Sequence, residues 1–121
     1  MTRKRIRERV LARDAEFIRR EAQRQEQAGA THIDVNAGAD PNREAEDMAW
    51  LTEVVAGATE LPLCFDSANP KALREGLSRC NRPGTIINSI TAEAERFDAV
   101  VPLVREFGTG VIALTMDDGG M

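Results

Sequence analysis

The sequence predicts an α/β protein built on a parallel β-sheet, and two observations support this. Segments in which apolar and polar residues alternate are separated by segments whose apolar residues recur at helical spacing. The combined unit is roughly 25–30 residues long, as in barrel and doubly wound folds. The chain has 121 residues. We therefore expect one domain over 1–121, too short for a complete (β/α)₈ barrel of about 250 residues.

Two helices are predicted before the first strand. Residues 2–12 carry a run of basic side chains around a few apolar ones, which is typical of a short solvated helix. Asp14 stands where it can cap a second helix, and Gly29 is expected to end that helix. One apolar face is predicted at helical spacing: Leu11, Ala15, Ile18 and Ala22.

The first strand is predicted over 31–36, where Ile33 and Val35 alternate with polar residues. Asp40-Pro41 matches a capping residue followed by proline at the first helical position, so a helix is expected to begin there. Its buried stripe, with Leu51 beside it, is predicted to consist of Ala45, Met48, Thr52 and Val55.

Three further strands are predicted, over 61–65, 85–90 and 111–116. Asn69-Pro70 repeats the cap and proline signal, before a helix that places Leu73 and Leu77 in the core. Thr91 is expected to cap the last helix, and Gly108 is expected to end it. Pro102 is expected to break or kink this helix.

Composition and charge argue against several functions. The net charge is −4 and the pI is about 5.1, whereas a nucleic-acid-binding domain is usually basic. No apolar run is long enough to span a bilayer, and no apolar signal core follows the basic N-terminus. Cys64, Cys80 and the single His32 lack the spacing of a zinc site, so we expect reduced thiols and no protein-bound metal. The sequence thus predicts a cytoplasmic protein that contacts neither nucleic acid nor membrane.

Polar residues end each predicted strand, and α/β proteins build their sites at that edge of the sheet. No phosphate-binding glycine loop, nucleophile elbow or strand-ending lysine is present. Carboxylates and carboxamides suit a flat heterocycle such as a pterin, because an ionised Asp accepts from two adjacent donors. Each residue taken singly is more simply explained as a turn cap, but the four strand ends together favour a site. The residues are Asp34 and Asn36, Asp66 and Ser67, Asn88 and Ser89, and Asp117 and Asp118.

Four of these strand ends resemble a known family. The resemblance is to the strand ends of methyltetrahydrofolate:corrinoid methyltransferases, in the order, spacing and identity of the residues. It is carried by Ile33–Gly38, Leu63–Pro70, Ile86–Thr91 and Leu114–Gly119. They also resemble the folate domain of cobalamin-dependent methionine synthase, and more distantly dihydropteroate synthase. The resemblance covers nearly the whole chain and implies a pterin-binding (β/α)₈ barrel, with methyltetrahydrofolate lying across its C-terminal mouth.

The resemblance also implies roles for individual residues. Asp66 and Asn88 would hydrogen-bond the pterin ring, while no catalytic residue is identified. In the family, the methyl group passes from a pterin ring nitrogen to a cobalamin carried by a partner corrinoid protein, and a hydrogen-bond network can protonate that nitrogen. No protein nucleophile is then required. The remaining residues expected to line or shape the mouth are Asp34, Asn36, Ser67, Met116 and Asp117.

The length of the chain departs from this family. Its members carry a strand before the first helix and three more strands at the end, so the sequence corresponds to a partial TIM barrel, about half of a (β/α)₈ barrel. Such a half-barrel is expected to be marginally stable, to self-associate, or to depend on its other half. Intact family members are expected to form homodimers. Two alternatives stay open: a dihydropteroate synthase-like transferase, and a truncated pterin-binding half-barrel without turnover.

Overall fold

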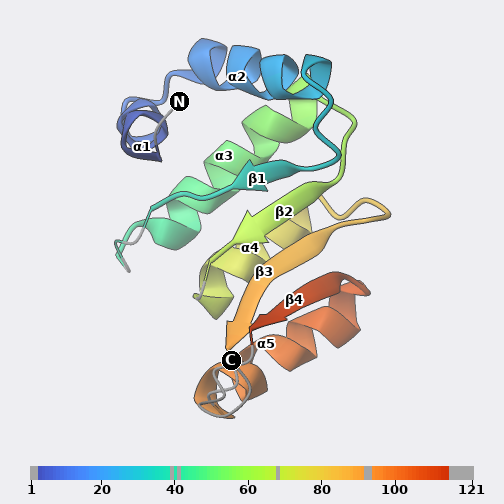
Figure 1. Cartoon of the computed structure of the whole chain (residues 1–121). Coiled ribbons are helices and arrows are strands. Elements are labelled where there is room, and N and C mark those ends of the chain that lie inside the picture. Colours follow the sequence, from blue (N-terminus) through green and yellow to red (C-terminus); the bar gives the residue numbers. More distant parts are fainter. Residues whose placement is uncertain (1–2, 39, 41, 68, 92–93, 115–121) are drawn as a thin grey trace.

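The computed structural model describes residues 3–38, 40, 42–67, 69–91 and 94–114. Helices and strands follow the predicted order (Figure 1). The elements are α1 (Arg3–Leu11), α2 (Ala15–Gln27), β1 (Ile33–Val35), α3 (Glu44–Ala58), β2 (Leu63–Asp66), α4 (Pro70–Arg79), β3 (Ile86–Thr91), α5 (Ala94–Phe107) and β4 (Gly110–Leu114).

Within the described residues, the sheet has four parallel strands in the order β1-β2-β3-β4, which confirms the predicted parallel α/β architecture. Each strand is therefore adjacent to the next one along the chain, as right-handed βαβ connections produce. Helices α3, α4 and α5 lie along one side of this sheet, while α1 and α2 lie beyond β1 (Figure 1). None of the helices in the described part of the chain combines the length and apolar content needed to cross a membrane.

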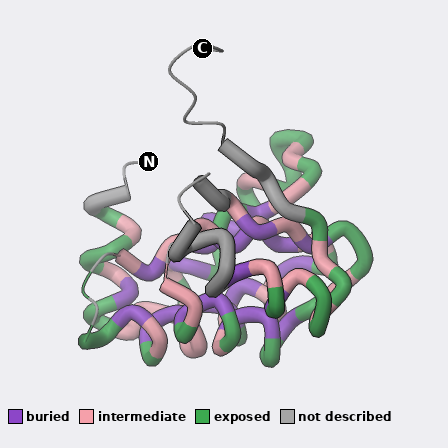
Figure 2. Tube along the Cα trace, turned by 90° about the horizontal axis from the view of Figure 1, so that it is seen from below, coloured by how far each residue is buried: buried purple, intermediate pink, exposed green. Residues whose placement is uncertain are grey.

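The two faces of the sheet differ in burial because successive side chains point to opposite faces. In β1 and β2, the residues facing the helices are at most 2% exposed, while the intervening residues are partly or fully exposed. Figure 2 shows the buried residues in the interior and the exposed ones on the outer turns and loops. We call the side away from α3 and α4 the open face. It carries Asp34, Cys64, Asp66, Ile86 and Asn88.

Local signals predicted several helix ends correctly. Asp14 caps α2 by accepting the Phe17 N–H at 3.2 Å, and Asn69 caps α4 by accepting the Lys71 N–H at 3.0 Å. Pro70 is the first residue of α4. Gly29 and Gly108 follow the ends of α2 and α5 with positive φ angles of 97° and 66°, a conformation that glycine adopts without strain.

Helix α3 begins at Glu44, so the prediction that it begins at Asp40-Pro41 is wrong. The Asp40 carboxylate accepts the Asn42 N–H at 2.9 Å, and the Asp40 carbonyl accepts the N–H groups of Arg43 and Glu44 at 3.0 and 2.8 Å. Asp40 therefore closes a turn before the helix, which is the other common use of an Asp side chain. Pro41 lies outside the described residues.

The predicted cap of α5 is also wrong, and Pro102 does not break the helix. Thr91 is the last residue of β3, whereas α5 starts at Ala94. The helix continues through Pro102, although proline removes one hydrogen bond from the ladder. Val100 and Leu103 are 3% and 2% exposed. Their burial anchors the helix on both sides of the proline.

The predicted apolar faces need two smaller corrections. Leu11 is 51% exposed because α1 ends there, so the buried face of α2 starts later, with Ile18 and Ala22. In α3 the stripe of Met48, Leu51, Thr52 and Val55 is buried as predicted, but Ala45 is partly exposed. Two acidic residues, Glu44 and Asp47, are buried in the same helix.

Candidate functional site

Three polar side chains lie on the open face of neighbouring strands, two of them where β1 and β2 end and one within β3 (Ile86–Thr91). Asp66, the last residue of β2, pairs with Asn88 of β3 in the parallel register. Asn36 directly follows β1, and its Nδ2 donates to Asp66 Oδ2 at 3.4 Å. We call Asn36, Asp66 and Asn88 the polar row. All three are partly exposed on the open face of the sheet, so the row can contact a ligand.

The orientation of Asn36 is fixed from its other end. Its Oδ1 accepts the backbone N–H of Gly38 at 2.8 Å, which leaves the amide nitrogen facing Asp66. Gly38 has a φ of 102°, in the region that favours glycine. A Cβ at this position would also lie 3.3 Å from Arg7 Nε. The Asn36-Ala37-Gly38 turn therefore holds one end of the polar row in place.

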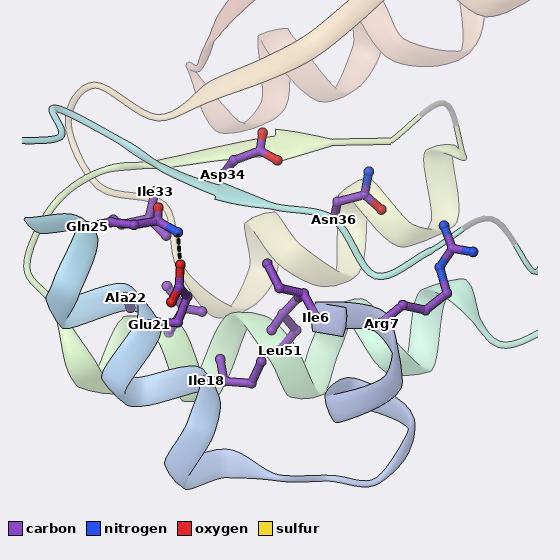
Figure 3. A pocket seen from close by; sticks show the side chains of 11 residues that line it. Ile6, Arg7, Ile18, Glu21, Ala22, Gln25, Ile33, Asp34, Asn36 and Leu51 are labelled. Atoms are coloured by element: carbon purple, nitrogen blue, oxygen red, sulfur yellow. Dashed lines mark hydrogen bonds between the residues drawn. The ribbon is translucent and has the colours of Figure 1, made fainter. Parts of the chain in front are cut away.

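Asp34 lies on the same face but one step toward the amino end of the sheet. It pairs in register with Cys64, and Cys64 pairs with Ile86. Figure 3 shows Asp34 and Asn36 on the same side of β1. Burial raises the pKa of the Cys64 thiol to about 11, with further contributions from the negative charges of Asp34 and Asp66. The thiol therefore stays protonated at neutral pH, and the field of the two carboxylates acts on this face.

Ser67 lies at the same edge but is 8% exposed. Its hydroxyl donates to Glu44 Oε2 and accepts the N–H of Asn69 at 2.9 Å. Its backbone N–H donates to the Asn88 carbonyl at 3.1 Å. A serine hydroxyl can donate only one hydrogen bond, and here it donates that bond to Glu44. Ser67 thus connects α3, β3 and the start of α4 immediately beside Asp66.

The two remaining predicted site residues, Met116 and Asp117, lie outside the described residues. Sequence reasoning missed Glu44, which proved to be the partner of Ser67. It was missed because α3 was expected to begin at Asp40-Pro41, which would place Glu44 inside the helix and not at its first residue.

A groove runs along β1 between that strand and helices α1 and α2 (Figure 3). Asp34 and Asn36 reach it from the strand, and Arg7 and Glu21 add polar groups from the helices. The rest of its lining is largely apolar: Ile6, Ile18, Ala22, Ile33, Leu51 and Val55. Most of these residues belong to the layer between helices and sheet. The groove therefore does not replace the polar row as the candidate ligand site.

Comparisons with known proteins identify the family of the chain. A family model described as "Pterin binding enzyme" matches residues 2–120. The chain is 36% identical over 118 residues to the methylcorrinoid:tetrahydrofolate methyltransferase of Eubacterium limosum, covering 96% of this chain and 43% of the relative. It is 31% identical over 124 residues to the methionine synthases of Mycobacterium leprae and Mycobacterium tuberculosis, covering 95% of this chain and 10% of each relative. The chain thus spans less than half the length of these relatives.

Proposed function

Because the chain belongs to the pterin-binding enzyme family, we propose that it forms part of a methyltransferase. The enzyme would transfer a methyl group from methyltetrahydrofolate to a corrinoid protein. The polar row carries this proposal, since it places hydrogen-bonding side chains of three consecutive strands on one face of a parallel sheet, level with the carboxyl end of β2. The relatives are a methyltransferase and methionine synthases, which favours methyl transfer over the dihydropteroate synthase alternative.

The polar row would bind the pterin ring through its hydrogen-bonding edge. A pterin presents an amino group and a ring N–H side by side, and the Asp66 carboxylate can accept both. Asn36 donates to one oxygen of that carboxylate and so limits its rotation. Asn88, opposite Asp66 in the register, both donates and accepts and can bind a mixed part of the ring edge.

The chemical step needs a pterin nitrogen that leaves easily. The corrinoid's cobalt, when bound on the partner protein, supplies the nucleophile that accepts the methyl group. The side chains of this chain would bind and orient the ring, and their hydrogen-bond network would supply the proton or the strong hydrogen bond that the leaving nitrogen needs. The name of the Eubacterium relative mentions methylcorrinoid and tetrahydrofolate, the reactants of the reverse direction. The same contacts serve both directions because both pass through one transition state.

The partner and the wider fold are part of the proposal. The polar row is only partly buried, so a cofactor held by a corrinoid protein can approach a ring bound there. Within the described residues, β1 pairs with β2 alone and β4 with β3 alone. Two such edges, with an apolar groove along β1, support the proposal that domain 1–121 is part of a (β/α)₈ barrel. Homodimer formation and a cytoplasmic location complete the proposal.

Calorimetric titration of the chain with 5-methyltetrahydrofolate tests the site directly. Asp66→Ala should weaken binding by about 1–3 kcal/mol, because the ring donors lose their acceptor. Asp40→Ala is the matched control: it removes an exposed carboxylate whose described role is to accept one backbone N–H. Its affinity should match that of the unmodified chain. Equal affinities for Asp66→Ala and the unmodified chain would refute the site, and no binding by the folded, unmodified chain would refute the proposal that this chain forms it.

A further inference from the structure

The loop that follows Asp66 is fixed by a buried carboxylate from another helix. Glu44, the first residue of α3, is 8% exposed, and its carboxylate accepts a hydrogen bond from the Ser67 hydroxyl. The two residues are 23 positions apart in the sequence. A buried carboxylate is costly unless it is hydrogen-bonded, and the first turn of a helix is a favourable place for one. The contact thus connects the start of α3 to the carboxyl end of β2.

Ser67 transmits this connection to its neighbours. Its hydroxyl accepts the Asn69 N–H at 2.9 Å, and Asn69 in turn caps α4. Its backbone N–H donates to the Asn88 carbonyl at 3.1 Å, next to the polar row. Ser67 is therefore held by α3, by β3 and by the start of α4. Because Asp66 is the preceding residue, fixing Ser67 also fixes the backbone from which the Asp66 side chain projects.

Asn36 holds the Asp66 side chain itself, through the 3.4 Å contact with Oδ2. Glu44 acts one step earlier, on the backbone, and neither contact replaces the other. Accurate placement of a binding carboxylate depends on such supporting contacts. We propose that Glu44 is a positioning residue of the pterin site, which holds Asp66 in its binding orientation through Ser67. This inference rests on the function proposed above.

The chain offers a matched control in the same helix. Asp47 is 2% exposed and also belongs to α3, but it pairs with Arg13 at 3.0 Å and Arg43 at 3.4 Å. These arginines connect α3 to the segment between α1 and α2 and to the preceding turn. Removing the charge of Asp47 therefore tests the general effect of disturbing a buried carboxylate of α3, without touching Ser67.

The experiment compares 5-methyltetrahydrofolate affinity, by calorimetry, with thermal stability for four variants. Glu44→Ala should bind about tenfold more weakly, the factor expected for loss of one buried hydrogen bond. Glu44→Gln should restore most of the affinity, because the amide oxygen still accepts from Ser67. Ser67→Ala should weaken binding at least as much as Glu44→Ala, since it removes the other half of the same bond together with the acceptor of the Asn69 N–H. Asp47→Asn should lower the melting temperature and leave the affinity unchanged.

The outcomes separate the inference from the proposed function. If the unmodified chain binds and Asp66→Ala binds about 1–3 kcal/mol more weakly, the pterin site of the proposed function holds. If folded Glu44→Ala then binds as tightly as the unmodified chain, the positioning role is refuted. If Glu44→Ala fails to fold, Ser67→Ala decides in its place, and unchanged affinity in that variant refutes the role. Equal loss of affinity in Glu44→Ala and Asp47→Asn also refutes it, because the effect would then be one of stability alone.

Discussion

Replacement of Gly76 by alanine should destabilise the protein, although alanine is the better helix former. A Cβ at this position of α4 would lie 2.6 and 2.8 Å from Phe65 Cε1 and Cδ1, and 3.3 Å from Met48 Cγ. Carbon atoms pack at about 3.5–4.0 Å, so the ring would have to move by about 1 Å. Phe65 and Met48 are both fully buried, which leaves little room for that movement.

The magnitude follows from two opposing terms. Overpacking a core costs about 1–3 kcal/mol, and the exchange of glycine for alanine in a helix gains about 1 kcal/mol. The difference is a net loss of up to about 2 kcal/mol in the free energy of unfolding, or up to roughly 8 °C in melting temperature. Phe65 precedes Asp66, so a shifted ring also predicts weaker binding of 5-methyltetrahydrofolate. Thermal unfolding followed by circular dichroism, with calorimetry for binding, measures both effects.

Gly57 provides the matched control. It lies in α3, and nothing comes within 4 Å of a Cβ built there. Gly57→Ala should therefore gain up to about 1 kcal/mol from helix propensity alone. The two substitutions are chemically identical and should differ in sign. If Gly76→Ala were as stable as Gly57→Ala, the close approach of α4 to β2 would be refuted.

Two further predictions concern the thiol and a buried hydroxyl. In a Cys80→Ser background, alkylation of Cys64 should accelerate only as pH approaches about 11, and Asp34→Asn should lower that midpoint. The pKa of the Cys64 thiol in the folded chain lies above the ordinary value of 9.0. The contribution of this thiol to stability is therefore complete below pH 9 and is lost as pH rises toward 11. Urea unfolding at several pH values measures this loss. Thr52→Val should add about 1 kcal/mol in the same assay, because the Thr52 hydroxyl is buried without a partner among the described residues. Thr59→Val should destabilise the chain instead, since that hydroxyl donates to Glu26 and accepts from Leu61.

The order of elements could be predicted because each signal is local. Asp14, Asn69, Gly29 and Gly108 act within their own turn of chain, and the structure confirms all four. Asp40-Pro41 failed as a helix start because the same side chain can close a turn or cap a helix. Burial of the residues that follow decides between these uses, and burial depends on the rest of the fold.

The chemistry of the site was easier to predict than its layout. Strand-end polarity named Asp66 and Asn88 among eight residues, the resemblance singled them out, and the register places them opposite each other. The role of Glu44 required knowledge of a contact across 23 residues, for which the sequence has no periodic signal. Ser67 could be recognised as a strand-end residue, but the sequence does not show that its hydroxyl donates a hydrogen bond to Glu44.

The register of the sheet places Asp34 and Asp66 at different heights along the strands, although Asp34, Asn36 and Asp66 share one face. Asp34 and Asn36 are two residues apart and so face the same side, which alternation alone predicts. Only the pairing of Asp34 with Cys64 shows that Asp34 lies one level below Asp66. A ring bound by Asp66 and Asn88 at the edge would therefore have Asp34 and the protonated Cys64 thiol beneath it. Asp34 then acts on such a ring through its charge, and Asp66 through direct hydrogen bonds. Asp34→Asn should accordingly change the affinity less than Asp66→Asn.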